Sequence, residues 1–223
     1  MLKSVIAKIV NGIMAGILIS IGGTVYLCCE NNYVGAVFFS VALLSICYLE
    51  YSLFTGKIGF IPEKHGKEEF SVLLLGLLGN LIGTFLFGLL IKYAIGGVGD
   101  KALLICSKKL EVNNFATTLI KGVMCGILMY IAVYVFKAHN KNPLGIIFGI
   151  PTFILCGFEH SIADMFYFAV SGIFSFDAFL FLMTVVLGNA IGGMLLPTLR
   201  LITTSKKPQT TEEKPMVEEN EEN

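Results

Sequence analysis

The stretch Gly157-Phe158-Glu159-His160-Ser161-Ile162-Ala163-Asp164-Met165 places three ionisable side chains inside an apolar segment that runs from about 144 to 170. A charged side chain at the centre of a bilayer costs roughly 2.5–3.5 kcal/mol on insertion scales. Such residues face a cavity or a partner, and they mark paths for ions or protons. Three such residues together therefore indicate a cavity or an ion path at this stretch.

The composition indicates an integral membrane protein. Of 223 residues, 55% are hydrophobic and 14% charged, and the apolar residues occur in long runs. The formal net charge is zero, which removes the case for nucleic-acid binding. Because no small-residue cleavage site follows the first apolar run, we expect the chain to be kept from Met1 onward.

The apolar runs predict an all-α membrane protein with six transmembrane helices, since about twenty residues cross the hydrocarbon core. The predicted spans are 5–29, 34–61, 70–95, 112–136, 144–171 and 178–203. An even number puts both termini on one side, which then holds eleven Lys and Arg residues against five on the other. Since cytoplasmic loops carry the basic excess, both termini are predicted to be cytoplasmic, in a multi-pass protein of the cell membrane.

Two regions are expected: a channel domain over 1–205 and a disordered, acidic cytoplasmic tail over 206–223. The tail is rich in Thr, Pro, Lys and Glu and has too little apolar surface to order itself. Six cysteines are scattered without a CxxC pair and are expected to act as small apolar residues. We predict no metal site and no cofactor. The cysteines are Cys28, Cys29, Cys47, Cys106, Cys125 and Cys156.

Three motifs occur twice, in the same order and 109 or 110 residues apart, which indicates repeats of about 5–95 and 112–203. Each repeat holds three spans, so the second enters the membrane from the opposite side, and the site is expected at the interface of this inverted 3+3 repeat. Segments 52–56 and 151–161 contain helix breakers, which predict broken second and fifth helices that meet at a pore. The motif pairs are 12–18 with 122–128, 50–53 with 159–162, and 79–83 with 188–192.

Gly157-Phe158-Glu159-His160-Ser161-Ile162-Ala163, Leu53-Phe54-Thr55-Gly56 and the paired Gly-Asn-x-Ile-Gly segments resemble the formate/nitrite transporter family over about residues 5–203. The resemblance implies an aquaporin-like, all-helical protomer that assembles as a homopentamer. It also implies one pore per protomer for small monovalent anions of weak acids. Thr55 and the central His160 match pore residues of the family. Apolar constrictions match Phe54 and Phe153 on the outer side and Leu53 on the inner side.

The sequence departs from this family pattern at three positions. Asp164 stands where many members have asparagine, and Gly126 stands where the fourth span often carries asparagine. The lysine that many members place at the outer mouth is shifted by one residue, with Lys109 nearest and Leu110 in the aligned position. These departures bear on the substrate more than on the fold.

Several polar residues have two interpretations. His160 is expected to gate the pore or give a proton, since histidine titrates closest to physiological pH, although an interhelical hydrogen bond is the simpler alternative. Thr55 supplies a hydroxyl opposite His160 or caps a helix at the break. Asp164 is either a protonated hydrogen-bond partner in place of asparagine or a charge that alters selectivity.

Other residues are expected to support the pore. Glu159 and its repeat counterpart Glu50 are predicted to tie the broken helices to backbone N–H groups rather than to touch the substrate. Asn80 and Asn189 lie among glycines, where small residues let helices approach and amides bond across them. The basic residues at the expected outer mouth either draw anions in or are simply solvated. They are Lys101, Lys108 and Lys109.

We therefore predict a pentameric channel or transporter in the lipid bilayer for formate first, then nitrite or hydrosulfide. The anion would take a proton at or near His160 and cross as the neutral acid. The alternative is an aquaporin-like pore for a small neutral solute, although the paired Asn-Pro-Ala signature is absent. An enzyme is not expected, because the neighbouring Glu159, His160 and Ser161 point different ways on a helix and catalytic triads converge from separate elements. No P-loop motif is present either.

Overall fold

The computed structural model describes residues 2–204, in which all regular secondary structure is helical. The predicted tail over 206–223 lies outside the described residues. The elements are α1 (Leu2–Cys28), α2 (Asn32–Tyr48), α3 (Phe54–Lys57), the short 3₁₀ helix η1 (Ile58–Phe60), α4 (Lys67–Ala94), α5 (Val98–Glu111), α6 (Phe115–Ala138), α7 (Leu144–Leu155), α8 (Ser161–Ser171) and α9 (Phe176–Thr204).

Four of the described helices are long and apolar enough to cross a bilayer, namely α1, α4, α6 and α9. They correspond to the first, third, fourth and sixth predicted spans. Three shorter apolar helices, α2, α7 and α8, lie in the other two predicted spans. The chain between α2 and α3 and between α7 and α8 is not helical, so each of these two spans is interrupted.

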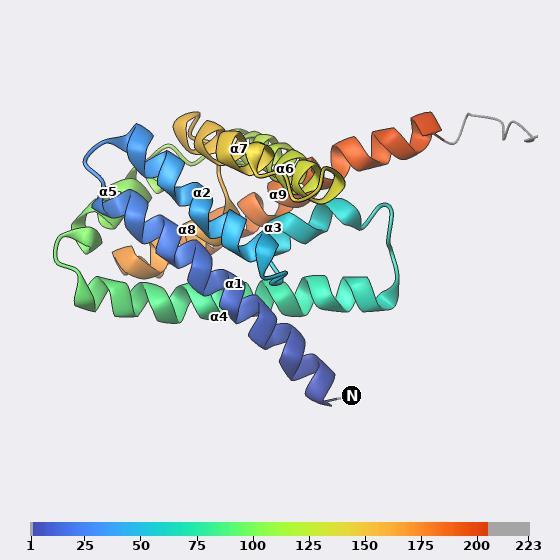
Figure 1. The fold of residues 1–223 in the computed structure, drawn as a ribbon. Helices are drawn as coiled ribbons and strands as arrows, with labels where there is room; N and C mark the ends of the chain where they lie inside the picture. Colours follow the sequence, from blue (N-terminus) through green and yellow to red (C-terminus); the bar gives the residue numbers. More distant parts are fainter. Residues whose placement is uncertain (1, 205–223) are drawn as a thin grey trace, which may run out of the picture.

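Glycines bring the long helices together in pairs, α1 with α4 and α6 with α9 (Figure 1). A Cβ atom on Gly79 would lie 2.8 Å from the Cα atom of Gly12, closer than real Cβ atoms come. A Cβ atom on Gly122 would lie 3.1 Å from the Cα atom of Gly188. The backbones approach this closely because no side chain separates them.

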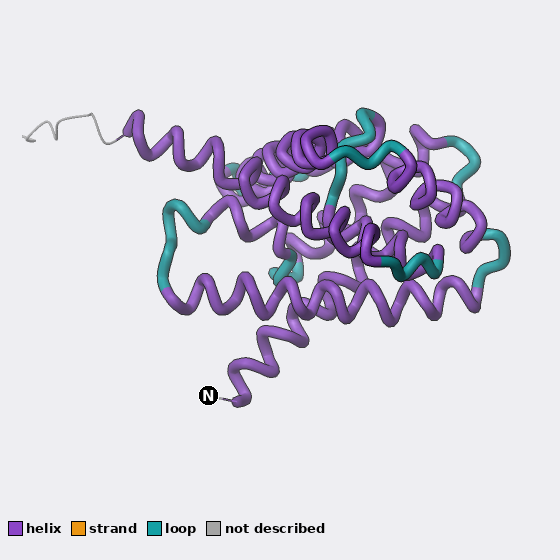
Figure 2. The backbone as a smooth tube through the Cα atoms, turned by 180° about the vertical axis from the view of Figure 1, so that it is seen from behind, coloured by secondary structure: helices purple, strands orange, loops and turns teal. Residues whose placement is uncertain are grey.

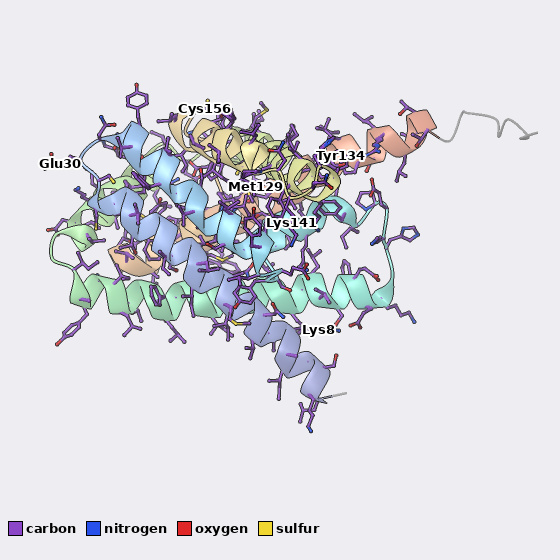
Figure 3. All side chains as sticks on the ribbon, viewed as in Figure 1. Lys8, Glu30, Met129, Tyr134, Lys141 and Cys156 are labelled. Carbon is purple, nitrogen blue, oxygen red and sulfur yellow. The ribbon has the colours of Figure 1, made fainter. Side chains whose placement is uncertain are left out.

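The molecule has two distinct ends along the long helices. The N-terminus, the last turn of α9 and the loop between η1 and α4 lie toward one end, called here the termini end (Figures 1 and 2). Helix α5 and the loops before α2 and α6 lie at the other end, called the α5 end. Glu30 marks the α5 end in Figure 3, and Lys8 lies toward the termini end.

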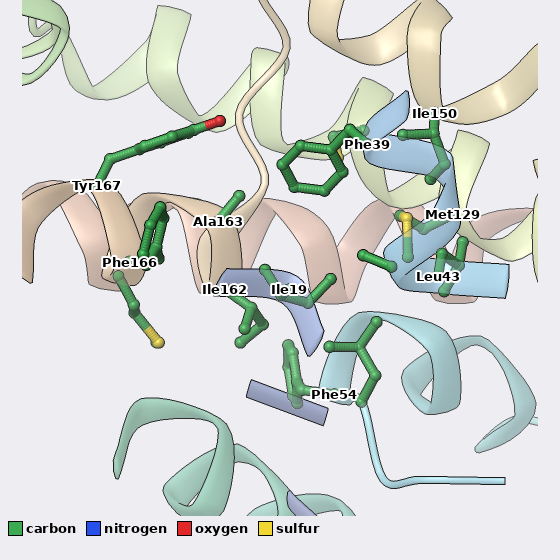
Figure 4. Packing of buried hydrophobic residues seen from close by; sticks show 14 of the residues in the cluster. Ile19, Phe39, Leu43, Phe54, Met129, Ile150, Ile162, Ala163, Phe166 and Tyr167 are labelled. Carbon is green, nitrogen blue, oxygen red and sulfur yellow. The ribbon is translucent and has the colours of Figure 1, made fainter. Parts of the chain in front are cut away.

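The core lies where the short helices meet α1, α4, α6 and α9. Phe39 and Leu43 of α2, Met129 of α6 and Ile150 of α7 are buried there (Figure 4). All 11 residues of α8 are buried, so this helix is enclosed by protein on every side. Large apolar side chains on the outer faces of the long helices remain exposed, which is typical of a surface that contacts lipid or other subunits.

Helix α5 was not expected, because its polar composition indicated only a segment between spans. Val98, Ala102 and Cys106 recur at helical spacing and are buried, whereas Lys101 and Lys108 are exposed. This narrow apolar stripe packs α5 mainly on α8. The helix therefore covers the α5 end of the core and brings Lys109 to it.

Candidate functional site

The side-chain amide of Asn80 on α4 holds the interruption between α2 and α3. Its Oδ1 atom accepts a hydrogen bond from the backbone N–H of Phe54 at 2.9 Å. Its Nδ2 atom donates to the carbonyl oxygens of Ser52 and Gly12, each at 2.8 Å. Asn80 is fully buried, so a single side chain satisfies backbone groups on both sides of the interruption and links them to α1.

Asn189 on α9 makes the same three kinds of bond at the interruption between α7 and α8. Its Oδ1 atom accepts from the backbone N–H of Ser161 at 2.9 Å. Its Nδ2 atom donates to the carbonyl oxygens of Glu159 at 2.8 Å and Gly122 at 2.9 Å. The two asparagines therefore stabilise non-helical backbone in the interior of the protein.

These bonds correct the alignment of the two interruptions. Ser52 and Glu159 take equivalent positions, and so do Leu53 and His160, which are the N-cap residues of α3 and α8. The predicted pairing of Glu50 with Glu159 was therefore wrong by two residues. Glu50 has a positive φ of 59° and lies in a different environment from Glu159.

Replacing Asn189 with alanine is expected to lower the free energy of unfolding by about 1–3 kcal/mol, because it leaves buried backbone groups without partners. The measurement is the thermal unfolding midpoint of the detergent-solubilised protein. Asn32→Ala, at the exposed first turn of α2, is the matched control. Equal midpoints for both variants would show that the amide does not hold the interruption.

His160 is fixed by three contacts at the centre of the molecule. Its Nδ1 atom accepts from the backbone N–H of Ala163 at 3.1 Å, which caps α8. Its Nε2 atom lies 2.8 Å from the hydroxyl oxygen of Thr55. Phe153 stacks on the imidazole with ring centroids 5.5 Å apart. Because the accepting Nδ1 atom has no proton, a neutral ring carries its proton on Nε2. The Nε2–H group then donates a hydrogen bond to the hydroxyl oxygen of Thr55.

Thr55 is used for this contact rather than for a helix cap. The N-cap residue of α3 is Leu53, which makes no side-chain capping bond. The Thr55 hydroxyl is buried and accepts from the imidazole, so its own hydrogen is free to bond to another acceptor. The pair therefore offers a buried hydrogen-bonding centre.

Two cavities approach this centre from opposite ends. The α5-side cavity, of about 180 Å³, is lined by aromatic side chains together with His160, Lys109 and Asp164. The termini-side cavity, of about 400 Å³, is lined by Leu53 and by three lysines and a glutamate. The charged residues of the second cavity are Lys57, Lys137, Lys141 and Glu50. The α5-side cavity and the termini-side cavity share no lining residue, so a solute that moves from one to the other must pass the residues between them.

A buried ion cluster lies beside His160 in the α5-side cavity. The Nζ atom of Lys109 pairs with a carboxylate oxygen of Glu159 and lies 3.1 Å from Oδ1 of Asp164. Lys109 therefore reaches the site despite its shifted position in the sequence. The side chain of Glu159 binds this lysine and not backbone N–H groups, so its predicted contacts were wrong.

The predicted apolar constrictions occupy three different positions. Phe153 lines the α5-side cavity, and Leu53 lines the termini-side cavity. Phe54 is buried but lines neither of them. Phe39 of α2, which was not predicted, lines the α5-side cavity and packs edge-on against Phe153 at 6.4 Å. Phe38 beside it is exposed, and no sequence signal separates the two.

The lysines are divided between the two ends. At the α5 end, Lys108 is exposed and Lys101 donates to the carbonyl oxygen of Leu27 at 2.8 Å; neither lysine is among the residues that line the α5-side cavity. At the termini end, Lys57 and Lys137 line the cavity but were not predicted as site residues. Their positions within or directly after apolar runs were the signal that identifies them.

Comparison with known proteins identifies the family of this chain. The family model described as formate/nitrite transporter matches residues 1–202. The formate-nitrite transporter of Plasmodium ovale is 27% identical over 228 aligned positions, which cover 86% of this chain and 72% of that protein. The formate channel FocB of Escherichia coli is 26% identical over 189, covering 74% and 66%.

A solved structure of a pentameric formate channel with formate bound has the same fold. It superimposes with a TM-score of 0.77 at 23% sequence identity, covering 92% of this chain and 99% of that chain. The family match extends over nearly the whole sequence. The chain therefore belongs to the formate/nitrite transporter family, whose members are channels and transporters rather than enzymes.

Proposed function

We propose that this protein forms a pore for small monovalent anions of weak acids, with formate first and nitrite or hydrosulfide next. One proton accompanies each anion near His160. The observation that carries the proposal is the buried contact of His160, which lines the α5-side cavity, with Thr55, whose chain neighbour Gly56 lines the termini-side cavity. The names of the relatives supply the substrate class.

The apolar surroundings explain why a proton is needed. Phe153 and Leu53, which line the two cavities, are apolar and only 3% and 1% exposed. A bare anion in such a place loses its hydration and gains few hydrogen bonds, which is costly. The neutral acid loses much less, and His160 with Thr55 supplies hydrogen bonds to its oxygens. Net movement is then electroneutral.

The same proposal includes the arrangement in the membrane. The helices α2 and α3 together make one crossing, and the helices α7 and α8 together make another. With the four long helices this gives six crossings, arranged as an inverted 3+3 repeat. Both termini face the cytoplasm, so the α5-side cavity opens outward. Five copies assemble, and the exposed apolar faces of the long helices meet lipid or neighbouring subunits. The pentameric structural neighbour and the equivalent bonds of Asn80 and Asn189 support this arrangement.

An aquaporin-like pore for a neutral solute is not favoured by the relatives, which are formate and nitrite transporters. It also gives no role to lysines at both cavities. Conduction of a neutral solute would be independent of pH, whereas the proposed pathway requires a proton.

Flux into proteoliposomes tests the proposal. Formate, nitrite and hydrosulfide are each offered outside vesicles that contain the wild-type protein, at two external pH values, with protein-free vesicles as the control. We expect formate to enter fastest and each flux to rise at the lower pH. Absence of protein-dependent flux for all three anions from intact oligomers would contradict the proposed function.

A further inference from the structure

We propose that the proton that accompanies each anion is held on the carboxyl group of Asp164, beside Glu159, and not on His160. This assignment rests on the proposed function. It follows from comparing the hydrogen bonds of His160 with those of Asp164, the two titratable groups considered for the proton in the α5-side cavity. His160 has both ring nitrogens engaged. Asp164 has an oxygen atom that no donor faces.

The contacts of His160 oppose a second proton on its ring. Nδ1 accepts the N–H of Ala163 at 3.1 Å, and this bond caps α8. A protonated Nδ1 would point its hydrogen at that N–H group and remove the cap. The positive end of the α8 dipole also lies at this position and disfavours an imidazolium. In this geometry, His160 donates a hydrogen bond through Nε2 but does not store a proton.

The net charge of the ion cluster favours one proton on Asp164. Lys109 contributes one positive charge, whereas ionised Glu159 and Asp164 would contribute two negative charges, a net charge of minus one in a buried site. Asp164 is 2% exposed, and its Oδ2 atom has no hydrogen-bond partner among the described residues. A proton on Oδ2 neutralises the cluster and gives this atom a hydrogen to share with Glu159.

The groups around Asp164 set when that proton binds. Lys109 attracts the ionised carboxylate of Asp164, whereas the carboxylate of Glu159, which pairs with the same lysine, repels it. The other titratable neighbours come from four elements: Cys106 on α5, Cys125 on α6, Tyr167 on α8, and Tyr26 on α1 beside Tyr167. None of these four carries a positive charge. Because Asp164 lines the α5-side cavity, its proton is exchanged through that cavity.

An ionised Asp164 repels an anion in the small cavity that both must share. Proton binding therefore precedes anion entry. The Oδ2–H bond then breaks as an O–H bond forms on the anion, the neutral acid moves past His160, and Asp164 keeps the negative charge. A proton from the α5-side solution restores the starting state. The cluster charge alternates between zero and minus one.

Asp164→Asn tests this order, because asparagine keeps the shape and cannot hold the proton. Formate flux is measured over a series of external pH values in the wild type, in Asp164→Asn and in the control Asp177→Asn, an exposed residue in the first turn of α9. Wild type and control are expected to gain about tenfold in flux per unit fall in pH over the range in which Asp164 is mostly ionised, as a one-proton step requires. Asp164→Asn is expected to lose this slope and at least about tenfold of the flux at low pH.

A purely structural role would lower flux by the same factor at every pH, so an unchanged slope in Asp164→Asn would overturn the assignment. Infrared difference spectra during pH titration provide a readout that needs no transport. A carboxylic C=O band is expected in the wild type and in Asp177→Asn and is expected to be missing in Asp164→Asn. An identical band in all three proteins would also overturn it. Flux missing from the wild type would count against the proposed function, whereas the spectra would still decide where the proton is held.

Discussion

Replacing His160 with asparagine is expected to lower formate flux by about 100-fold while the fold is preserved. Asparagine is a strong N-cap residue, so its side-chain oxygen keeps the bond to the N–H of Ala163 that caps α8. Its shorter side chain does not reach Thr55 and does not stack on Phe153. The variant therefore removes the hydrogen-bond donor between the two cavities without removing the cap.

The measurement is formate flux into proteoliposomes, with oligomer size and thermal unfolding recorded for the same preparations. His139→Asn, at an exposed position after α6, is the matched control and is expected to conduct like the wild type. If a folded His160→Asn protein conducts formate at the wild-type rate with the same pH dependence, the central role of His160 is contradicted.

Replacing Lys109 with leucine is expected to lower the free energy of unfolding by about 3–5 kcal/mol, because it leaves buried charge without its partner. Lys109 is the cation that pairs with both Glu159 and Asp164, whose side chains are 6% and 2% exposed. One of the two carboxylates must then take up a proton or the local structure must open. The thermal unfolding midpoint of the solubilised protein reports the loss.

A second substitution separates loss of charge balance from loss of packing. Glu159→Gln in the Lys109→Leu background removes one negative charge and is expected to recover a large part of the lost stability, a non-additivity typical of residues in contact. Lys108→Leu, on the exposed face of the same helix, is the control and is expected to have little effect. If the double variant is no more stable than Lys109→Leu, the ion cluster does not account for the loss.

The centre of the candidate site was predictable because an ionisable residue within an apolar run usually faces a cavity or a polar partner. His160 and Asp164 line the same cavity, and Thr55 contacts His160, although 105 residues separate them in sequence. The repeated Gly-Asn motifs likewise led to Asn80 and Asn189. Each of these predictions rested on polar atoms that must find partners once they are buried.

The residue contacts at the two interruptions were less predictable. Non-helical segments in two repeats can differ in length, and such a difference shifts the alignment of the residues around them. The interruptions align two residues away from the predicted register, so Ser52 and Leu53, and not Glu50, correspond to Glu159 and His160. The narrow stripe of Val98, Ala102 and Cys106 was too short to indicate α5. Without that helix, the contact of Lys109 with the two carboxylates could not be inferred.

The most direct test of the account records formate and internal pH together in the same proteoliposomes. With wild-type protein and an inward formate gradient, the account predicts that one proton enters with each formate ion and that no membrane potential develops. The same vesicles with His160→Asn are expected to show neither change at a comparable rate. Formate entry that builds a membrane potential without internal acidification would contradict the account.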